Sequence, residues 1–352
     1  MHLASERLMR GVFLPGDRRL ELNEVGRPAP GRGQVLVRMR ASSICGSDLR
    51  AIYRPVEQGS GPEAYRGVIA GHEPSGEIVE IGSEVSRFGV GHRVIVYHIA
   101  GCGLCHNCRT GWMISCTSPE RAAYGWQRDG GHAPYLLAEE RSLVALPDQL
   151  SFVDGAMVAC GFGTSYAALQ RLDVSGADRL LVVGLGPVGL GTALLGRALG
   201  AEVVGVEAMP ARRVLAEQLG FGAIVEPGPG ALDELRALTG GDGFEAVVDC
   251  SGHPDGRLLG IEAAREWGRV AFVGEGGRVS FDVSPLVIHR QLTLVGSWVC
   301  SIGQMEELVE RLVRWKLHPE VIVTDRFPLE RAAEAYRLAD GGEAGKVTFV
   351  WD

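Results

Sequence analysis

Four cysteines stand close together in one glycine-rich stretch of the sequence. Cys102, Cys105, Cys108 and Cys116 follow the spacing C-x2-C-x2-C-x7-C within 15 residues. Four thiolates can close a tetrahedron around zinc, and the short spacers let neighbouring sulfurs share one ion. An iron–sulfur cluster and two disulfides are the competing interpretations. Because a zinc ion with four protein ligands has no open position, we expect this site to hold a loop and the chemistry to lie elsewhere.

Other cysteines and a histidine lie in short motifs outside this cluster. Cys45 stands in the segment SICGSD, His72 is followed directly by Glu73, and Cys160 begins the segment CGFGT. Taken singly, each has an ordinary interpretation, because a free cysteine is usually a small buried hydrophobe and a lone histidine a core or surface residue. These motifs gain meaning only in combination.

A glycine motif is typical of a dinucleotide site. Gly184, Gly186 and Gly189 form G-x-G-x-x-G, with Pro187 and Val188 between the last two, after an apolar strand and before a helical segment. The three glycines allow a tight turn, a close approach to a pyrophosphate and close helix–strand packing. The helix N-terminus then offers free N–H groups to the phosphates. A glycine-rich turn in a buried strand–helix unit is the structural alternative.

The residues after the next strand bear on the choice of cofactor. Glu207 stands where an acidic residue would accept both ribose hydroxyls of NAD and repel the 2′-phosphate of NADP. Arg212 and Arg213 follow it and could instead bind that phosphate. We expect NAD.

The secondary-structure elements that must position these residues follow two different patterns along the chain. The first 150 residues have period-two strand patterns at 34–40, 76–82 and 91–97, which predict a β-rich domain. From about residue 154, strands at 180–183, 202–206, 223–225, 246–249, 270–273 and 292–295 alternate with helices at 190–199, 211–219, 232–238 and 255–267. This alternation predicts an α/β fold with a doubly wound parallel sheet. A helix at 305–315 and a strand at 346–351 are expected to pack back onto the first domain.

Composition excludes several classes of protein. With 46% hydrophobic residues and 22% charged ones, the 352-residue chain is typical of a globular protein of about two domains. Its net charge of −8 argues against nucleic-acid and anionic-membrane partners. Eight cysteines are too few for a disulfide scaffold, and no continuous apolar stretch for secretion occurs near the N-terminus, so we expect a cytoplasmic protein.

Together and in this order, the five motifs resemble the medium-chain, zinc-dependent alcohol dehydrogenase family, with a hint of its threonine- and polyol-oxidising branch. The resemblance spans essentially the whole chain. It implies a GroES-like catalytic domain at 1–153 and 297–352 and a Rossmann domain at 154–296. It also implies two zinc ions per chain and a homotetramer, or alternatively a homodimer.

The same resemblance implies roles for individual residues. Cys45, His72 and Cys160 would bind a catalytic zinc whose fourth position holds water, with Glu73 as a nearby carboxylate that approaches the metal transiently. Ser47 would take the proton of the substrate hydroxyl. Many relatives have a histidine proton relay where this chain has Arg50, and a guanidinium is a poor relay, so ribose hydroxyls and water are the expected substitutes.

Contacts to the cofactor and the substrate are also implied. Thr164, Val273, Gly274 and Ser297 would line the nicotinamide, and Lys346 falls where relatives place a cation, although an exposed strand charge is an equal alternative. His98, Tyr124, Trp126 and Trp298 are candidates for the substrate pocket. A polar imidazole at His98 would favour a hydroxylated substrate, whereas packing beneath the metal loop is the alternative.

The expected function is transfer of a hydride from a polar secondary alcohol to NAD, giving a ketone or aldehyde. Polyols, cyclitols, sugar alcohols and amino alcohols are the expected substrates. One alternative is a dehydrogenase of simple alcohols that uses NAD or NADP. An alternative of another class is a non-catalytic zinc-loop or dinucleotide-binding interaction protein.

Overall fold

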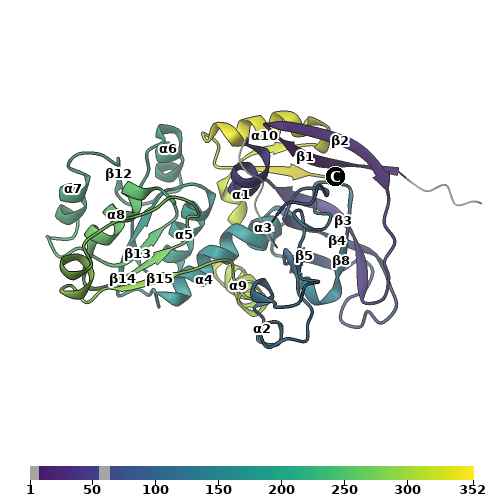
Figure 1. The fold of residues 1–352 in the computed structure, drawn as a ribbon, viewed down its shortest axis with the longest axis horizontal. Coiled ribbons are helices and arrows are strands. Elements are labelled where there is room, and N and C mark those ends of the chain that lie inside the picture. Colours follow the sequence, from purple (N-terminus) through teal and green to yellow (C-terminus); the bar gives the residue numbers. More distant parts are fainter. Residues whose placement is uncertain (1–7, 55–63) are drawn as a thin grey trace, which may run out of the picture. The chain divides into compact units, whose positions relative to one another are not determined.

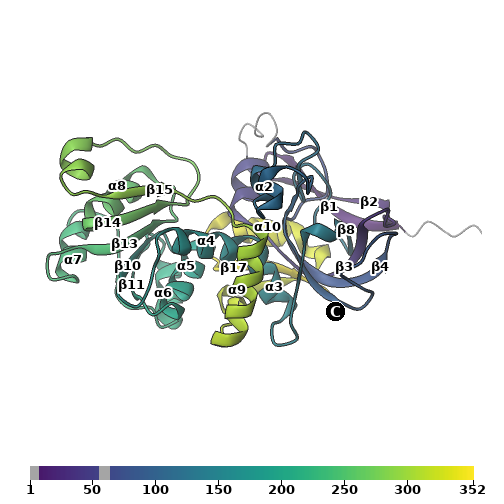
Figure 2. The same cartoon turned by 90° about the horizontal axis from the view of Figure 1, so that it is seen from below.

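The computed structural model describes residues 8–54 and 64–352, and the chain divides into two compact units (Figures 1 and 2). The first unit comprises Met1–Cys160 together with Cys300–Asp352, and the second comprises Gly161–Val299. Each unit has its own sheet and its own buried apolar cluster.

The first unit is built mainly from short strands. Seven strands form one sheet in the order β16-β17-β3-β4-β5-β9, with β8 paired to β3, while β1 pairs with β2 and β6 with β7. The predicted strands form, but Leu36 and Ile95, which lie between the core valines of β3 and β5, are buried as well, so burial does not alternate strictly along these strands. The strands are β1 (Leu8–Gly16), β2 (Arg19–Gly26), β3 (Gln34–Ser43), β4 (Glu73–Ile81), β5 (Arg93–Val96), β6 (Ile99–Ala100), β7 (Ala122–Ala123), β8 (Tyr135–Glu139), β9 (Leu143–Ala145), β16 (Val323–Phe327) and β17 (Lys346–Val350).

The C-terminal segment belongs to this first unit. β17 pairs antiparallel with β3, so the tail packs onto the β-rich unit as the sequence predicts. The longest helix here, α9, begins at a capping box in which Ser301 and Gln304 satisfy each other's backbone N–H groups. The helices of the unit are α1 (Gly46–Asp48), α2 (His106–Arg109), α3 (Phe152–Met157), α9 (Ile302–Trp315) and α10 (Ala332–Gly341).

The second unit is a six-stranded parallel sheet in the order β12-β11-β10-β13-β14-β15, which confirms the predicted doubly wound sheet. The strand order reverses direction between β10 and β13, the point at which such sheets bind ligands. The strands are β10 (Arg179–Val183), β11 (Glu202–Val206), β12 (Ile224–Val225), β13 (Phe244–Asp249), β14 (Ala264–Phe272) and β15 (Thr293–Gly296). The helices are α4 (Gly163–Arg171), α5 (Pro187–Ala198), α6 (Pro210–Gln218), α7 (Ala231–Ala237) and α8 (Pro254–Ala263).

The helix predicted at 255–267 is too long. α8 ends at Ala263, and Ala264 takes an extended backbone because it begins β14 and pairs with Phe244. Trp267, the last residue of the predicted helix, is 65% exposed and has a φ of +62°. Strand pairing therefore overrides helical periodicity at this point.

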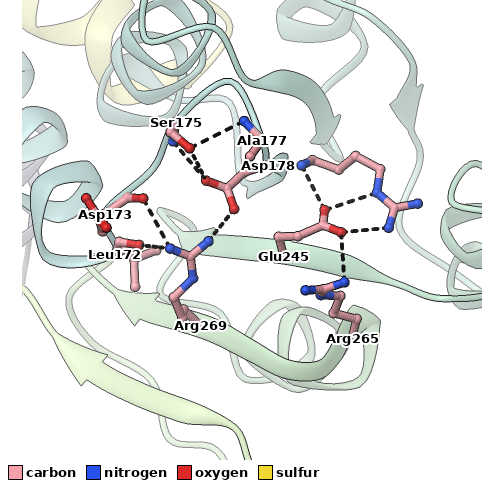
Figure 3. A network of polar contacts seen from close by, with 9 residues as sticks. Leu172, Asp173, Ser175, Ala177, Asp178, Glu245, Arg265 and Arg269 are labelled. Carbon is pink, nitrogen blue, oxygen red and sulfur yellow. Dashed lines mark hydrogen bonds and ion pairs between the residues drawn. The ribbon is translucent and has the colours of Figure 1, made fainter.

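Ion pairs link β10 and β13 to β14 near the amino-terminal ends of β10 and β13 (Figure 3). Arg179 binds Glu245 through Nη2 at 2.7 Å, and Arg269 binds both Asp178 and the carbonyl oxygen of Leu172. Burial acts to raise the pKa of Glu245, but the hydrogen bonds from Arg179 outweigh it and lower that pKa to about 2. This network lies at the end of the sheet opposite the glycine motif, so it holds the strands and leaves the other end free for a ligand.

One helical run in the described part of the chain is long and apolar enough to cross a membrane. It covers Phe152–Arg171, from α3 through the π-helical turn η5 (Val158–Phe162) to α4. Of its most apolar window, 89% is buried inside the protein, which is typical of a core helix.

Candidate active site and metal centres

The four predicted loop cysteines come together in the first unit. The sulfur atoms of Cys102, Cys105, Cys108 and Cys116 all lie within 4.8 Å of one another. The loop between β6 and β7 carries all four, with Cys105 capping the short helix α2. A Cβ at Gly101 would lie 2.7 Å from the sulfur of Cys108, so a glycine is needed there for the loop to close. The donor set and its packing fit a tetrahedral zinc site.

Backbone N–H groups surround these sulfurs. Cys102 Sγ accepts from the N–H groups of Leu104 at 3.4 Å and Cys105 at 3.3 Å, which lower the pKa of Cys102. Similar hydrogen bonds from Cys108 and Thr117 lower the pKa of Cys105 to about 6. Because thiolates are the form that binds zinc, the loop backbone prepares Cys102 and Cys105 for a cation, whereas burial raises the pKa of Cys108 to about 12.

The dispersed motifs also converge, on a second cluster in the same unit. Donor atoms of Cys45, His72, Glu73 and Cys160 lie within 4.8 Å of one another. Cys45 caps α1 and Cys160 lies in the π-helical turn η5, a kind of distortion that is frequent at functional sites. His72 and Glu73 lie at the start of β4, directly after Gly71, whose φ is +95°. Cys45, His72 and Glu73 are all less than 9% exposed.

Asp48 orients the histidine of this cluster. Its Oδ1 lies 2.8 Å from Nδ1 of His72 and also accepts a hydrogen bond from Nε1 of Trp126 at 3.1 Å. Its Oδ2 accepts from the backbone N–H of Cys45 at 3.2 Å. Nε2 of His72 is thereby left for a metal, and Ser47 Oγ lies 3.5 Å from that nitrogen. Sequence reasoning missed this role, although an acidic residue three positions after Cys45 is a recognisable signal for a helix cap.

The two thiols of the second cluster differ in acidity. A hydrogen bond from Cys160 and the nearby His72 lower the pKa of Cys45, whereas the hydrogen bond to Cys45 and desolvation raise the pKa of the partly buried Cys160. Burial acts to lower the pKa of His72, but Asp48 and Cys45 outweigh it and raise that pKa. A buried set of one thiolate, a second thiol and an oriented imidazole fits a divalent zinc ion, which displaces the protons when it binds.

Glu73 does not stand alone beside this cluster. Lys346 Nζ lies 2.6 Å from Glu73 Oε2, and the two side chains are 3% and 0% exposed. The alternative of an exposed strand charge at Lys346 is therefore wrong. Burial acts to lower the pKa of Lys346, but Glu73 and Cys45 outweigh it and raise that pKa, so Lys346 is a buried cation.

The four candidate pocket residues have different surroundings. His98 is buried with its ring centroid 5.3 Å from that of His72, and its Nδ1 lies 2.9 Å from the carbonyl oxygen of Ala159. Burial lowers the pKa of His98 to about 4, so the ring is neutral. Trp126 contacts the same His72 edge-on at 6.4 Å. In contrast, Tyr124 is fully buried in the apolar core of the sheet, where its hydroxyl accepts from the N–H of Glu139, and Trp298 is 49% exposed in the second unit.

The glycine motif of the second unit forms the predicted turn between β10 and α5. Gly184 has a φ of +88°, and a Cβ at Gly189 would lie 1.8 Å from the carbonyl oxygen of Gly184. Gly186 caps α5, whose first residue is Pro187, so the N-terminus of a twelve-residue helix is left open to an anion. These are the requirements of a phosphate-binding turn.

Glu207 is fixed beside this turn. Its two carboxylate oxygens accept hydrogen bonds from the N–H of Leu185 at 2.6 Å and the N–H of Met209 at 2.8 Å. A cavity of about 680 Å³, lined in part by Gly184 and Glu207, opens at this end of the sheet. The cavity and the glycine turn together fit the adenosine half of a dinucleotide.

The two arginines after Glu207 are placed differently. Arg213 Nη1 donates to the carbonyl oxygens of Glu207 and Ala208, and its Nη2 lies 3.2 Å from Glu226. Arg212 lies over the glycine turn, where a Cβ at Gly186 would be 3.5 Å from its Nη1. Its buried Nε has no hydrogen-bond partner among the described residues.

The remaining cofactor candidates lie in the second unit. Val273 and Gly274 follow β14, and both of their N–H groups donate to the carbonyl oxygen of Asp249. Ser297 follows β15, and its N–H donates to the carbonyl oxygen of Phe272. Thr164 is a buried residue of α4. Val273, Gly274 and Ser297 thus lie at the carboxyl ends of the parallel strands, where such folds bind their ligands.

Comparison with known proteins identifies the family. The alcohol dehydrogenase GroES-like domain matches residues 31–148, and the zinc-binding dehydrogenase domain matches residues 187–314. The chain therefore belongs to the zinc-binding alcohol dehydrogenase family, as its motifs predict, and is an oxidoreductase of the GroES-like plus Rossmann architecture.

Individual relatives agree with this assignment. The chain is 47% identical over 348 residues to the zinc-type alcohol dehydrogenase-like protein YphC of Escherichia coli, covering 96% of this chain and 98% of the relative. It is 31% identical to L-threonine 3-dehydrogenase of Pyrococcus horikoshii, covering 94% of both chains, and 30% identical to sorbitol dehydrogenase of Halalkalibacterium halodurans, covering 93% and 94%. The solved alcohol dehydrogenase TADH from Thermus sp. ATN1 superposes with a TM-score of 0.87 at 27% identity, covering 97% and 99%.

Proposed function

We propose that this protein oxidises a polar secondary alcohol to a ketone with NAD as the hydride acceptor, using a zinc ion held by Cys45, His72 and Cys160. The observation that carries the proposal is the buried cluster itself, in which Asp48 orients His72 and Lys346 pairs with Glu73. Three protein ligands leave zinc one exchangeable position, whereas the four-cysteine cluster leaves none.

Different residues of the chain would serve different steps of this reaction. When bound, zinc supplies a Lewis acid that lowers the pKa of an alcohol hydroxyl, and the dinucleotide supplies the acceptor for the hydride. Ser47 Oγ would accept the hydroxyl proton while its own hydroxyl proton passes on, a relay role that its position 3.5 Å from His72 Nε2 supports. A guanidinium stays protonated, so Arg50 would not act as the base that receives this proton, and the ribose hydroxyls of a bound dinucleotide together with water would supply the way out. Trp126 and the neutral His98 flank His72 and exclude bulk water from it.

The surroundings of Glu207 support NAD over NADP. A carboxylate fixed by two backbone N–H groups offers its oxygens to ribose hydroxyls and repels a 2′-phosphate. Arg213 is already bound to two carbonyl oxygens and to Glu226, so it is not available to that phosphate. Arg212 lies over the glycine turn, where it would pair with the pyrophosphate that both cofactors share.

A polyol or an amino alcohol is the proposed substrate. The polar imidazole of His98 beside the metal cluster would suit a second hydroxyl or an amine better than an aliphatic chain. The relatives named threonine and sorbitol dehydrogenases act on substrates of this kind, as their names state.

The proposed function also implies domain bounds, a localisation and an oligomeric state. We assign residues 1–153 and 297–352 to the catalytic domain and residues 154–296 to the nucleotide-binding domain, in a cytoplasmic homotetramer. Strand β15 lies at one edge of the parallel sheet, which supports assembly through that edge.

The test is to follow the absorbance of reduced nicotinamide with the zinc-loaded protein. A panel of polyols, cyclitols and amino alcohols is compared with simple alcohols, each with NAD and with NADP. We expect the highest kcat/KM with a polar secondary alcohol and NAD. Preference for simple alcohols would overturn the substrate class, and no alcohol-dependent reduction by protein with two zinc ions would overturn the function.

A further inference from the structure

The Lys346–Glu73 pair is set by the register of three neighbouring strands. Thr348 of β17 lies opposite Ser43 of β3, which in turn lies opposite Glu73 of β4. Lys346 is two residues before Thr348, so the alternation of a strand directs both side chains to the same face of the sheet. Ser43 Oγ and Thr348 Oγ1 are 2.8 Å apart on that face, which fixes the alignment of the strands. The sheet therefore delivers Lys346 to Glu73.

The pair is buried and has few other polar contacts. Among the residues that the structure describes, neither carboxylate oxygen of Glu73 has a hydrogen bond of good geometry, and Lys346 Nζ is the cation at 2.6 Å from Oε2. Lys346 is thus a buried cation whose main compensation is Glu73. Separating them would leave a buried charge without a partner, which proteins avoid strongly.

Glu73 is also close enough to serve as a metal ligand. Its donor oxygen belongs to the same group as Cys45, His72 and Cys160, with all four donor atoms within 4.8 Å of one another. A zinc ion bound by all four residues would have a complete tetrahedron of protein ligands. It would then resemble the four-cysteine cluster and would offer no position to a substrate.

We propose that Lys346 is a positioning residue that holds Glu73 away from the fourth position of the zinc ion and so keeps the site open to substrate. The inference rests on the proposed function, because it requires a metal at Cys45, His72 and Cys160. If Glu73 moves onto the metal, Lys346 is left as a buried cation without its carboxylate, and this penalty favours the open site. A neutral residue at position 346 removes the penalty.

The test uses the full-length protein with cobalt(II) in place of zinc and imidazole as the probe of the open position. In the wild-type protein, imidazole should change the visible spectrum of one of the two cobalt ions. In Lys346→Met, Glu73 occupies that position, so the imidazole concentration that gives half the change should rise at least about tenfold, as is typical for partners of metal ligands. The four-cysteine cluster provides an internal reference, since its spectrum should ignore imidazole.

Three further variants separate positioning from simple loss of structure. Lys346→Arg keeps the charge and should keep the wild-type response to imidazole. Lys346→Gln keeps a polar side chain without the charge and should behave like Lys346→Met even if the latter folds poorly. The double variant Lys346→Met with Glu73→Gln removes the competing carboxylate and should restore the response.

The outcomes distinguish the inference from the function on which it rests. A wild-type response in both Lys346→Met and Lys346→Gln would overturn the inference and leave the proposed function intact. Loss of response that the double variant does not restore would also overturn it. A wild-type protein that binds only one cobalt ion would contradict the proposed function, and the inference with it.

Discussion

The two metal clusters of the first unit are built in opposite ways. The four cysteines lie on one loop between β6 and β7, and Cys102, Cys105 and Cys108 are only partly buried. The second cluster draws its ligands from α1, β4 and η5, and its carboxylate is paired with a lysine from β17. A cluster on one loop can close around an ion with four cysteines and fasten that loop, whereas in the dispersed cluster the sheet supplies a lysine that pairs with the one carboxylate among the donors.

The largest expected effect separates the two clusters by function. Cys160→Ala removes one ligand of the open site, so the zinc content should fall from two ions per chain to one and kcat/KM by at least about a thousandfold, the loss of several kcal/mol of Lewis-acid stabilisation. Metal analysis and the nicotinamide assay measure both. Cys250→Ala is the matched control, because Cys250 is a thiol outside both clusters whose only described side-chain partner is Thr192. Full activity in Cys160→Ala would refute the ligand role.

Loss of the metal ion from the four-cysteine cluster should lower the stability of the protein and not its activity. Cys105→Ser should also reduce zinc to one ion per chain, but the loss is expected in the thermal midpoint, by about 10 °C for a few kcal/mol in a chain of this size. Protein that remains folded should keep most of its kcat, since this ion touches no substrate. A midpoint equal to that of the wild type, with zinc lost, would show that the loop needs no metal.

A smaller effect tests the orientation of His72. Asp48→Asn should weaken metal binding at the open cluster about 10- to 100-fold while leaving the four-cysteine ion in place. A chelator competition on the zinc-loaded protein measures both affinities. Asp154→Asn is the matched control, since Asp154 is another fully buried acid that caps a helix and pairs with a histidine, His318, outside the cluster. Equal zinc affinities in the two variants would argue against the role of Asp48.

The smallest expected effect is on the pH dependence of stability and comes from His132, which packs next to the Cys45, His72 and Cys160 cluster. His132 is fully buried against Gly71, and its Nδ1 lies 3.1 Å from the hydroxyl of Tyr336. Burial lowers its pKa from 6.5 to about 4, so the unfolded chain binds more protons than the folded one between these values, and stability is lost as the pH falls through this window.

This histidine should account for about 2 kcal/mol of the stability lost between pH 7 and pH 5, by the linkage between proton binding and folding. Urea unfolding of the wild type and of His132→Asn at both pH values gives the measurement. The variant should be less stable at pH 7 but should lose less on acidification. Parallel losses in the two proteins would mean that His132 is already protonated in the folded state.

Sequence spacing predicted the local features and left out those made by strand register. The four-cysteine loop and the turn of Gly184 and Gly186 are recognisable because all their parts lie within a few residues. The contact of Lys346 with Glu73 depends on the alignment of β17, β3 and β4, which no single segment encodes. Tyr124 was a candidate for the pocket because of its neighbours in sequence, yet its side chain faces the core of the sheet.

The most direct test of the difference between the clusters is a crystal structure with anomalous scattering recorded at the zinc edge. We predict two zinc peaks per chain. One should be bound by Cys102, Cys105, Cys108 and Cys116, and the other by Cys45, His72 and Cys160 plus a non-protein ligand, with Glu73 still on Lys346. A single peak, or a second zinc bound by four protein side chains, would contradict the account.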